Sequence, residues 1–159
     1  MVESHTKYRS IGMASKIGSM FSQTVEYALR AIVHLARQPE AIQTTAQIAN
    51  ATQVPAPYLS KVLQRLTRDG LVEVRRGVNG GYLLGKSPDK LTIYEVVQCV
   101  DPIERIRTCP LELSSHRKRL CSLHAKMDSA LESIETVFRT TTLSELMTSP
   151  NPSVPLCNT

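Results

Sequence analysis

The sequence predicts a mainly α-helical protein with one small β-hairpin and a long C-terminal helix. Apolar residues recur at helical spacing in several separate segments, and a glycine-rich turn joins two short strand-like runs in the middle of the chain. The 159 residues are enough for one compact domain with appendages. Because the chain has no Trp and only two Phe, its core has to be built from Leu, Val, Ile and Ala, which suits packed helices.

The N-terminal third is expected to hold a flexible extension and two helices. Residues 1–19 mix polar residues without a sustained period and are expected to form the extension. Ser22 is a good N-cap for the first helix, which Pro39 closes, and the apolar residues between them follow the spacing of an amphipathic helix. A second, shorter helix is predicted with Thr44 or Thr45 as its cap.

A third helix is predicted between two prolines and a glycine. Pro55 and Pro57 fit its opening, where a missing N–H costs little, and Gly70 is a natural C-terminal stop. One side of this helix is apolar and consists of Leu59, Val62, Leu63 and Leu66. The rest of its surface is polar and carries Tyr58, Ser60, Lys61, Gln64, Arg65 and Arg68.

A short hairpin follows the third helix directly. LVEVRR from Leu71 alternates like a strand, GVNGG supplies the turn, and YLL from Tyr82 is apolar enough for the returning strand. A further helix is capped by Thr92 and ends at Asp101. Three helices followed at once by a hairpin describe a winged helix-turn-helix domain, which we place at residues 20–101.

The C-terminal third is expected to hold a loop, a long helix and a tail. Residues 102–119 are polar and form the loop. Helical periodicity returns from Leu120 to Phe138, and its apolar stripe suits either a partner helix or packing within its own chain. Segment 120–147 therefore holds this long helix and a short terminal helix, TLSELM, and residues 148–159 are expected to be disordered.

Basic residues gather in the third helix and the hairpin. The whole chain has a formal charge of +5, and from Lys61 to Lys90 there are seven basic residues against three acidic ones. Arg75 and Arg76 stand beside flexible glycines, from which a guanidinium can reach a phosphate or a narrow minor groove. In this fold the third helix enters the major groove of double-stranded DNA, and its candidate contacts are Tyr58, Ser60, Lys61, Gln64 and Arg65.

Other classes of function find less support. A protein-interaction module, whose basic surface only keeps the chain soluble, is the rival interpretation. No apolar run approaches the roughly 18 residues needed to cross a bilayer, and residues 1–20 lack the apolar stretch of a signal peptide, so we expect a cytoplasmic protein with no membrane partner. No nucleophile with its base, no phosphate-cradling loop and no paired catalytic carboxylates stand at informative spacing, so no enzyme is expected.

Three segments resemble the Rrf2 family of bacterial transcriptional regulators. They are MFSQTVEYALRAIVHLA, VPAPYLSKVLQRLTRDGLVEVRRGVNGGYLLGK and LTIYEVVQCVD, which span about Phe21 to Asp101. The resemblance implies a homodimer that binds a palindromic operator, with the helix near Tyr58 reading DNA and the wing arginine supplementing it. It also implies that the helix from Leu120 is the dimerisation helix. Residues 102–119 would then form the sensor loop, through which a repressor senses iron–sulfur status or redox state.

Many members of this family hold an iron–sulfur cluster on three loop cysteines. Cys109 and Cys121 stand twelve residues apart and His124 follows three later, which matches the outer cysteines and the histidine of one cluster-bearing branch. The middle cysteine of that branch is missing here, since Ser115 and His116 stand in its place.

Three interpretations of this loop stay open. Cys109, His116, Cys121 and His124 together suit a [2Fe–2S] cluster, and the same four donors suit a tetrahedral zinc ion. A thiol switch between Cys109 and Cys121 without any bound metal is the competing mechanism.

Two residues outside the loop are weaker candidates as ligands. Cys99 offers a further thiolate, although its valine neighbours favour a buried structural cysteine. Glu26 stands where some relatives place an acidic ligand from the partner subunit, and the alternative for it is an exposed carboxylate at the start of a helix.

Overall fold

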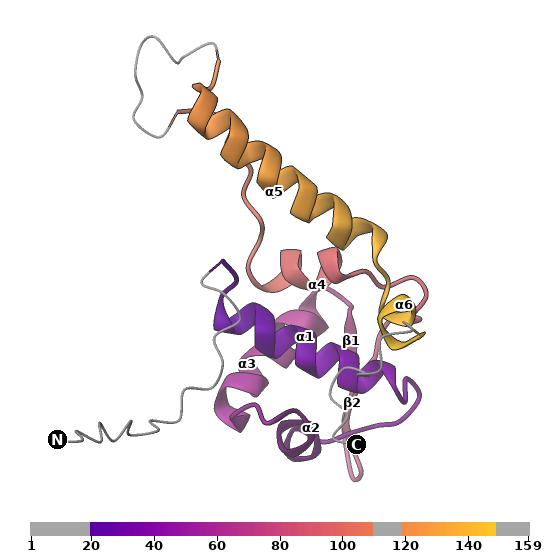
Figure 1. Ribbon diagram of the computed structural model, residues 1–159. Coiled ribbons are helices and arrows are strands. Elements are labelled where there is room, and N and C mark those ends of the chain that lie inside the picture. The colour runs from indigo at the N-terminus through magenta and orange to yellow at the C-terminus, as the bar shows by residue number, and fades with distance from the viewer. Residues whose placement is uncertain (1–19, 110–118, 149–159) are drawn as a thin grey trace, which may run out of the picture.

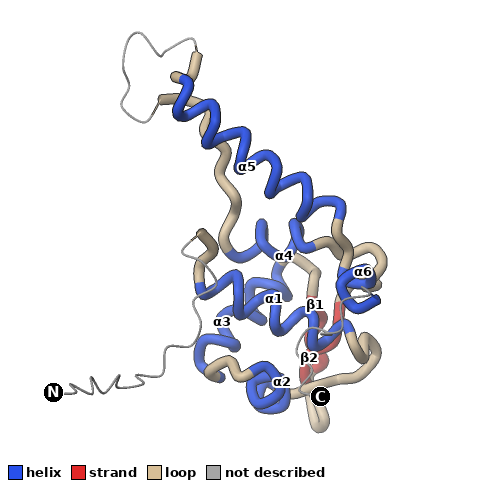
Figure 2. Tube along the Cα trace, viewed as in Figure 1, coloured by secondary structure: helices blue, strands red, loops and turns tan. Residues whose placement is uncertain are grey.

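The computed structural model describes residues 20–109 and 119–148 of the chain. Within these ranges it contains six helices and one antiparallel hairpin (Figure 1, Figure 2). They are α1 (Gln23–Ala36), α2 (Thr45–Thr52), α3 (Ala56–Arg68), β1 (Val72–Arg75), β2 (Gly81–Leu84), α4 (Ile93–Val100), α5 (Ser122–Thr140) and α6 (Leu143–Thr148). The predicted extension at residues 1–19, half of the predicted loop (110–118) and the tail from residue 149 lie outside the described residues.

Three helices begin at residues that the capping patterns predict. The Ser22 side chain accepts a hydrogen bond of 3.4 Å from the backbone N–H of Val25 at the start of α1. Thr44 and Thr92 each exchange hydrogen bonds with a glutamine or glutamate three residues later, which fixes the starts of α2 and α4. Thr44, and not Thr45, is therefore the cap of α2.

A tight turn joins α2 to α3. Gln53 ends α2 in the left-handed region, with a φ of 55°, and Pro55 and Pro57 follow at the N-cap and in the first turn of α3.

The helices pack on one apolar core, whose fully buried side chains include Ile32, Leu35, Ile48, Leu59, Leu63, Leu66, Val96 and Val97. Gly70 ends α3 with a φ of 72°, as its position in the sequence predicts.

The hairpin is held to the domain by one of its strands. Val72 pairs with Leu84, and Val74 pairs with Tyr82 in the antiparallel register. The backbone of Tyr82 also exchanges two hydrogen bonds of 2.8 Å with Gln43, just before α2. The predicted hairpin is confirmed, and within its first strand Val72 is buried whereas Val74 is 42% exposed.

Helix α5 extends away from the body of the molecule (Figure 1). It begins at Ser122, two residues later than predicted, and buries none of its own residues. Close to its C-terminal end the ring of Phe138 packs on Phe21, with centroids 5.5 Å apart. The chain then returns to the body, where Leu143 of α6 is fully buried. None of the described helices is long and apolar enough to span a membrane.

Candidate nucleic-acid interface and cysteine loop

The buried side of α3 determines which of its side chains face solvent. This side consists of four apolar residues with exposed fractions of 3% or less: Leu59, Val62, Leu63 and Leu66. Side chains at the intervening positions of a helix point to its other side. Of the predicted DNA contacts in α3, Ser60 is half-buried and four are exposed: Tyr58, Lys61, Gln64 and Arg65.

Two polar side chains near the start of α3 are oriented by local contacts. The Ser60 hydroxyl donates a hydrogen bond of 3.0 Å to the backbone carbonyl of Ala56, one turn earlier. The ring of Tyr58 meets the ring of Tyr27 edge-on, with centroids 6.3 Å apart. Both side chains keep polar atoms that can bind an external group.

Farther along α3, Arg65 differs from its neighbours. Its Nη1 donates a hydrogen bond of 2.8 Å to the backbone carbonyl of Val100, at the end of α4. Lys61 and Gln64, in contrast, make no side-chain hydrogen bond or ion pair with any residue that the structure describes, and both are exposed. Nη1 of Arg65 therefore binds a group within the protein and not solvent or an external ligand.

The tip of the hairpin carries the two predicted arginines. Arg75 and Arg76 are both exposed, and Arg75 lies 3.5 Å from a carboxylate oxygen of Glu73. Gly77 has a φ of 104°, and a Cβ on Gly80 would lie 2.4 Å from the carbonyl oxygen of Arg75. The turn therefore requires glycine at both positions. In Figure 1 the hairpin tip and α2 lie at the end of the molecule opposite the start of α5.

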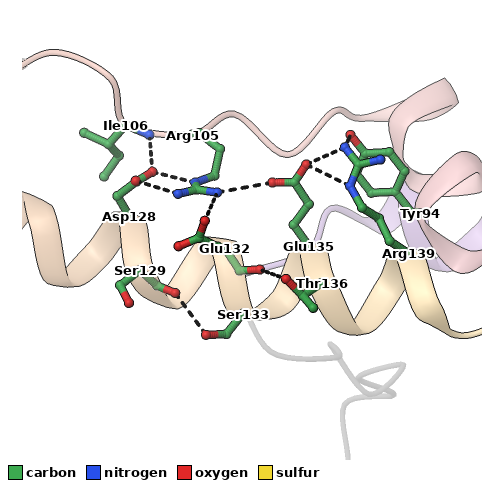
Figure 3. Close-up of polar contacts among 10 residues, drawn as sticks. All are labelled: Tyr94, Arg105, Ile106, Asp128, Ser129, Glu132, Ser133, Glu135, Thr136 and Arg139. Atoms are coloured by element: carbon green, nitrogen blue, oxygen red, sulfur yellow. Dashed lines mark hydrogen bonds and ion pairs between the residues drawn. The ribbon is translucent and has the colours of Figure 1, made fainter.

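A polar network that the sequence patterns do not predict joins the segment after α4 to α5 (Figure 3). Arg105, whose side chain is 13% exposed, donates two hydrogen bonds of 2.7 Å to the carboxylate of Asp128. The backbone N–H of Ile106 donates to the same carboxylate at 2.9 Å. Glu132 and Glu135 lie 3.4 and 3.5 Å from Nη1 of Arg105. The helical spacing of these three acidic residues is the signal in the sequence that points to a shared cation.

The network continues from α5 to α4. Arg139 donates a 2.7 Å hydrogen bond to Glu135, lies 3.5 Å from the ring centroid of Tyr94, and also donates to the Tyr94 hydroxyl. Hydrogen bonds from Arg105 hold the pKa of Asp128 below its usual range, and those from Arg139 lower the pKa of Glu135. Both carboxylates are thus charged at neutral pH, and paired charges fasten α5 to the body.

The predicted ligands of the loop come together only in part. Cys121 is the N-cap residue of α5, and its Sγ lies 3.3 Å from Nδ1 of His124. Cys109 is buried, and His116 lies outside the described residues. A thiol beside an imidazole suits iron or zinc. However, the part of the chain that the structure describes contains no group of three or more His, Cys, Asp or Glu side chains that could hold a metal ion.

The two weaker candidates have partners of their own. Burial, together with a hydrogen bond to Asp69, raises the pKa of the Cys99 thiol to about 12, which disfavours the thiolate that a metal needs. Glu26 is less exposed than expected, since its side chain is 20% exposed and pairs with Arg30 at 2.7 Å on the same helix. Neither residue lies in a ligand cluster within the described ranges.

Comparisons with known proteins agree on one family. The sequence model of the Rrf2 family, described as an iron-dependent transcriptional regulator, matches residues 21–149. An HTH-type transcriptional regulator of Aquifex aeolicus is 31% identical over 131 residues, which are 80% of this chain and 91% of that protein.

Solved structures of regulators share the fold. CymR, the global cysteine regulator of B. subtilis, superposes with a TM-score of 0.66 at 25% identity, over 79% of this chain and 94% of CymR. IscR of T. potens superposes with a TM-score of 0.66 at 22% identity, over 83% of this chain and 88% of IscR. The predicted mainly helical fold with a winged helix-turn-helix is confirmed.

Proposed function

The chain belongs to the Rrf2 family of transcriptional regulators. From this premise we propose that it binds duplex DNA with the exposed side of α3 and the two wing arginines, Arg75 and Arg76. The family and the relatives named above are regulators of transcription, so the protein is not an enzyme. The observation that carries the proposal is the division of α3 into a wholly buried apolar side and an exposed polar side, next to a hairpin with a basic tip.

Each of the following polar side chains of α3 and the wing has a role that suits its chemistry. Ser60 and Gln64 lie one turn apart on α3 and offer neutral hydrogen-bonding groups for base edges. Lys61 lies between them and supplies a point charge for a phosphate, and the Tyr58 hydroxyl suits a phosphate as well. Arg76, beside the glycine turn, suits a phosphate or a narrow minor groove.

We propose that α5 pairs with α5 of a second copy. This helix buries no residue within its own chain, yet Leu123, Met127 and Val137 are exposed to 64%, 49% and 58%. Apolar residues at this spacing lie along one side of a helix and become buried when a second helix covers them. A two-fold dimer would present two copies of α3 to a palindromic operator and repress by occupying it.

The cysteine loop is proposed as the sensor. The family is described as iron-dependent, and the thiol of Cys121 lies beside the imidazole of His124, which supports a [2Fe–2S] cluster or a zinc ion held by Cys109, His116, Cys121 and His124. CymR, which is named as a global cysteine regulator, shares the fold. A metal-free thiol switch of Cys109 and Cys121 is the second candidate.

A salt titration tests DNA binding directly. Affinity for a labelled duplex is measured by fluorescence anisotropy over a range of salt concentrations for the wild type, Arg76→Met and Lys126→Met. Lys126 is exposed on α5, so its replacement removes one charge far from the proposed interface. The affinity should fall steeply with salt, and Arg76→Met should lower the slope of log affinity against log salt by about one, whereas Lys126→Met should not.

The alternative, a module that binds only proteins, makes the opposite prediction. A wild type that fails to bind duplex even at low salt would contradict the proposed function. So would an Arg76→Met variant that binds duplex with the same salt slope as Lys126→Met.

A further inference from the structure

Arg65 spans from α3 to a segment far away in the sequence. Its Nη1 lies 2.8 Å from the carbonyl oxygen of Val100, which follows it by 35 residues. The predicted role of Arg65 is direct DNA contact, yet this hydrogen bond directs one end of its guanidinium into the protein. The contact therefore joins the helix proposed to read DNA to the last residue of α4.

The carbonyl of Val100 needs a donor from outside its helix. Helix α4 ends at Val100, and the N–H of the following residue, Asp101, donates back to Val97. Pro102 carries no N–H and cannot continue the helix. The last carbonyls of a helix have no intrahelical partner and carry a partial negative charge, so a guanidinium is a well-matched donor.

The same two helix ends also bring Cys99 near Asp69. Burial raises the pKa of the thiol of Cys99, next to Val100, and so does the nearby carboxylate of Asp69, the C-cap residue of α3. The C-terminal turns of α3 and α4 therefore lie side by side at this place. The hydrogen bond from Arg65 to Val100 restricts the distance between these two turns.

The chain beyond Val100 is held as well. Five and six residues later, the side chain of Arg105 and the backbone N–H of Ile106 both bind the carboxylate of Asp128 on α5. The short segment between α4 and the cysteine loop is therefore fixed by α3 at its start and by α5 near its end.

We propose that Arg65 is a positioning residue for DNA reading, which acts by holding α3 to the end of α4 and not by contacting DNA. The proposal rests on the proposed DNA-binding function. In this role Arg65 sets the angle at which Ser60, Lys61 and Gln64 meet the duplex. Specific recognition depends on that angle, whereas loose electrostatic attraction to any duplex does not.

Lys61 provides a matched control on the same helix. It stands one turn before Arg65, carries the same charge, is exposed, and has no side-chain partner among the described residues. Removing either charge changes the net charge by the same amount. Only the replacement of Arg65 removes a contact within the protein.

The experiment compares Arg65→Met with Lys61→Met, because methionine keeps an unbranched apolar stem in both places. The probes are a duplex selected from random-sequence DNA with the wild type, and a shuffled duplex of equal length. Arg65→Met should weaken binding of the selected duplex about tenfold or more, with affinity for the shuffled duplex within about twofold of wild type and an unchanged salt slope. Lys61→Met should weaken binding of both duplexes and lower the salt slope by about one.

Two outcomes would overturn the proposal. A salt slope that falls in Arg65→Met as it does in Lys61→Met would make Arg65 a phosphate contact. Unchanged affinity of Arg65→Met for the selected duplex would show that its contact with Val100 does not position α3.

Two further measurements keep the proposal testable if the variant does not fold or if the wild type binds no duplex. In a crystal structure of the wild type on the selected duplex, Arg65 should remain bonded to Val100, and a guanidinium turned to a phosphate would contradict the proposal.

Without DNA, hydrogen exchange of the amides near Val100 should be faster in Arg65→Met than in Lys61→Met. Equal exchange rates would count against the positioning contact, whereas failure of the wild type to bind any duplex would count against the proposed function alone.

Discussion

The guanidinium of Arg105 and the carboxylate of Asp128 form a two-point ion pair, with both N–O distances at 2.7 Å, across 23 residues of sequence. The pair fastens the segment that leads to Cys109 along the side of α5. Helix α5 buries none of its own residues, so contacts of this kind and the packing of Phe138 on Phe21 hold it in position. The pair therefore connects the proposed sensor loop to the proposed dimerisation helix.

Removing the charge of Asp128 is expected to loosen α5. Asp128→Asn leaves Arg105 with only the longer contacts to Glu132 and Glu135, and the side chain that loses its partner is 13% exposed. Thermal unfolding followed by circular dichroism should show a Tm lowered by several degrees. Glu132→Gln is the control, because the Glu132 side chain is 62% exposed and its replacement should change the Tm little. Equal effects of the two substitutions would contradict the importance of the pair.

The same pair predicts how stability depends on pH. Hydrogen bonds from Arg105 lower the pKa of Asp128 below the ordinary value of 3.8, so the native protein binds fewer protons at this site than the unfolded chain. The ionised Asp128 side chain therefore stabilises the fold fully at pH values above its pKa in the unfolded chain. This stabilisation is lost as the pH falls through the lower pKa that Asp128 has in the folded protein. The difference in stability between wild type and Asp128→Asn, measured by urea unfolding, should therefore shrink below about pH 4. A difference that stays constant from pH 7 to about pH 3 would exclude this linkage.

The wing turn should not tolerate a side chain at Gly80. A Cβ there would lie 2.4 Å from the carbonyl oxygen of Arg75, a backbone atom that cannot move without distorting the hairpin. Gly80→Ala is expected to cost about 1–3 kcal/mol of stability and to weaken duplex binding, because the wing arginines are displaced. Val78→Ala, at a position 97% exposed on the same turn, should leave both quantities near wild type. Wild-type duplex binding by Gly80→Ala would show that the wing geometry is not needed.

The cysteine loop is tested by purification without oxygen. If the loop holds an iron–sulfur cluster, the wild type should contain iron and labile sulfide and absorb visible light, and the double variant Cys109→Ala, Cys121→Ala should lose all three signals. Cys99→Ala is the control, since a thiol with a pKa near 12 should not be a ligand. Zinc without sulfide would favour the tetrahedral site, and a colourless, metal-free wild type that still binds DNA would reject both metal hypotheses.

Local signals explain why most of the fold could be predicted. Caps such as Ser22 and Thr92 bind backbone groups three residues away, so the residues that form the contact are visible together in the sequence. The apolar side of α3 likewise repeats within one helix and predicts its own burial. The strand that contains Val74 was also predicted, but the exposure of the Val74 side chain was not, because it depends on which elements pack around the strand and not on the strand's own pattern.

Contacts between distant residues explain what the sequence does not reveal. Arg65 fits a DNA-facing pattern on its helix, and nothing nearby in the sequence indicates that the carbonyl of Val100 lies within its reach. The partners of Arg105 form an acidic stripe on α5, but the stripe alone does not tell which cation it binds. Such pairings are determined by tertiary packing, which brings together residues that share no local pattern.

Selection of bound duplexes from random-sequence DNA measures whether the exposed side of α3 reads base edges. For the wild type we expect enrichment of an inverted repeat whose half-sites are centred about one helical turn, ~10 base pairs, apart or a multiple of it. For Gln64→Ala we expect the same repeat with the preference lost at one position in each half-site. Recovery of duplexes with no common sequence, or an unchanged preference in the variant, would show that this side of α3 does not read bases.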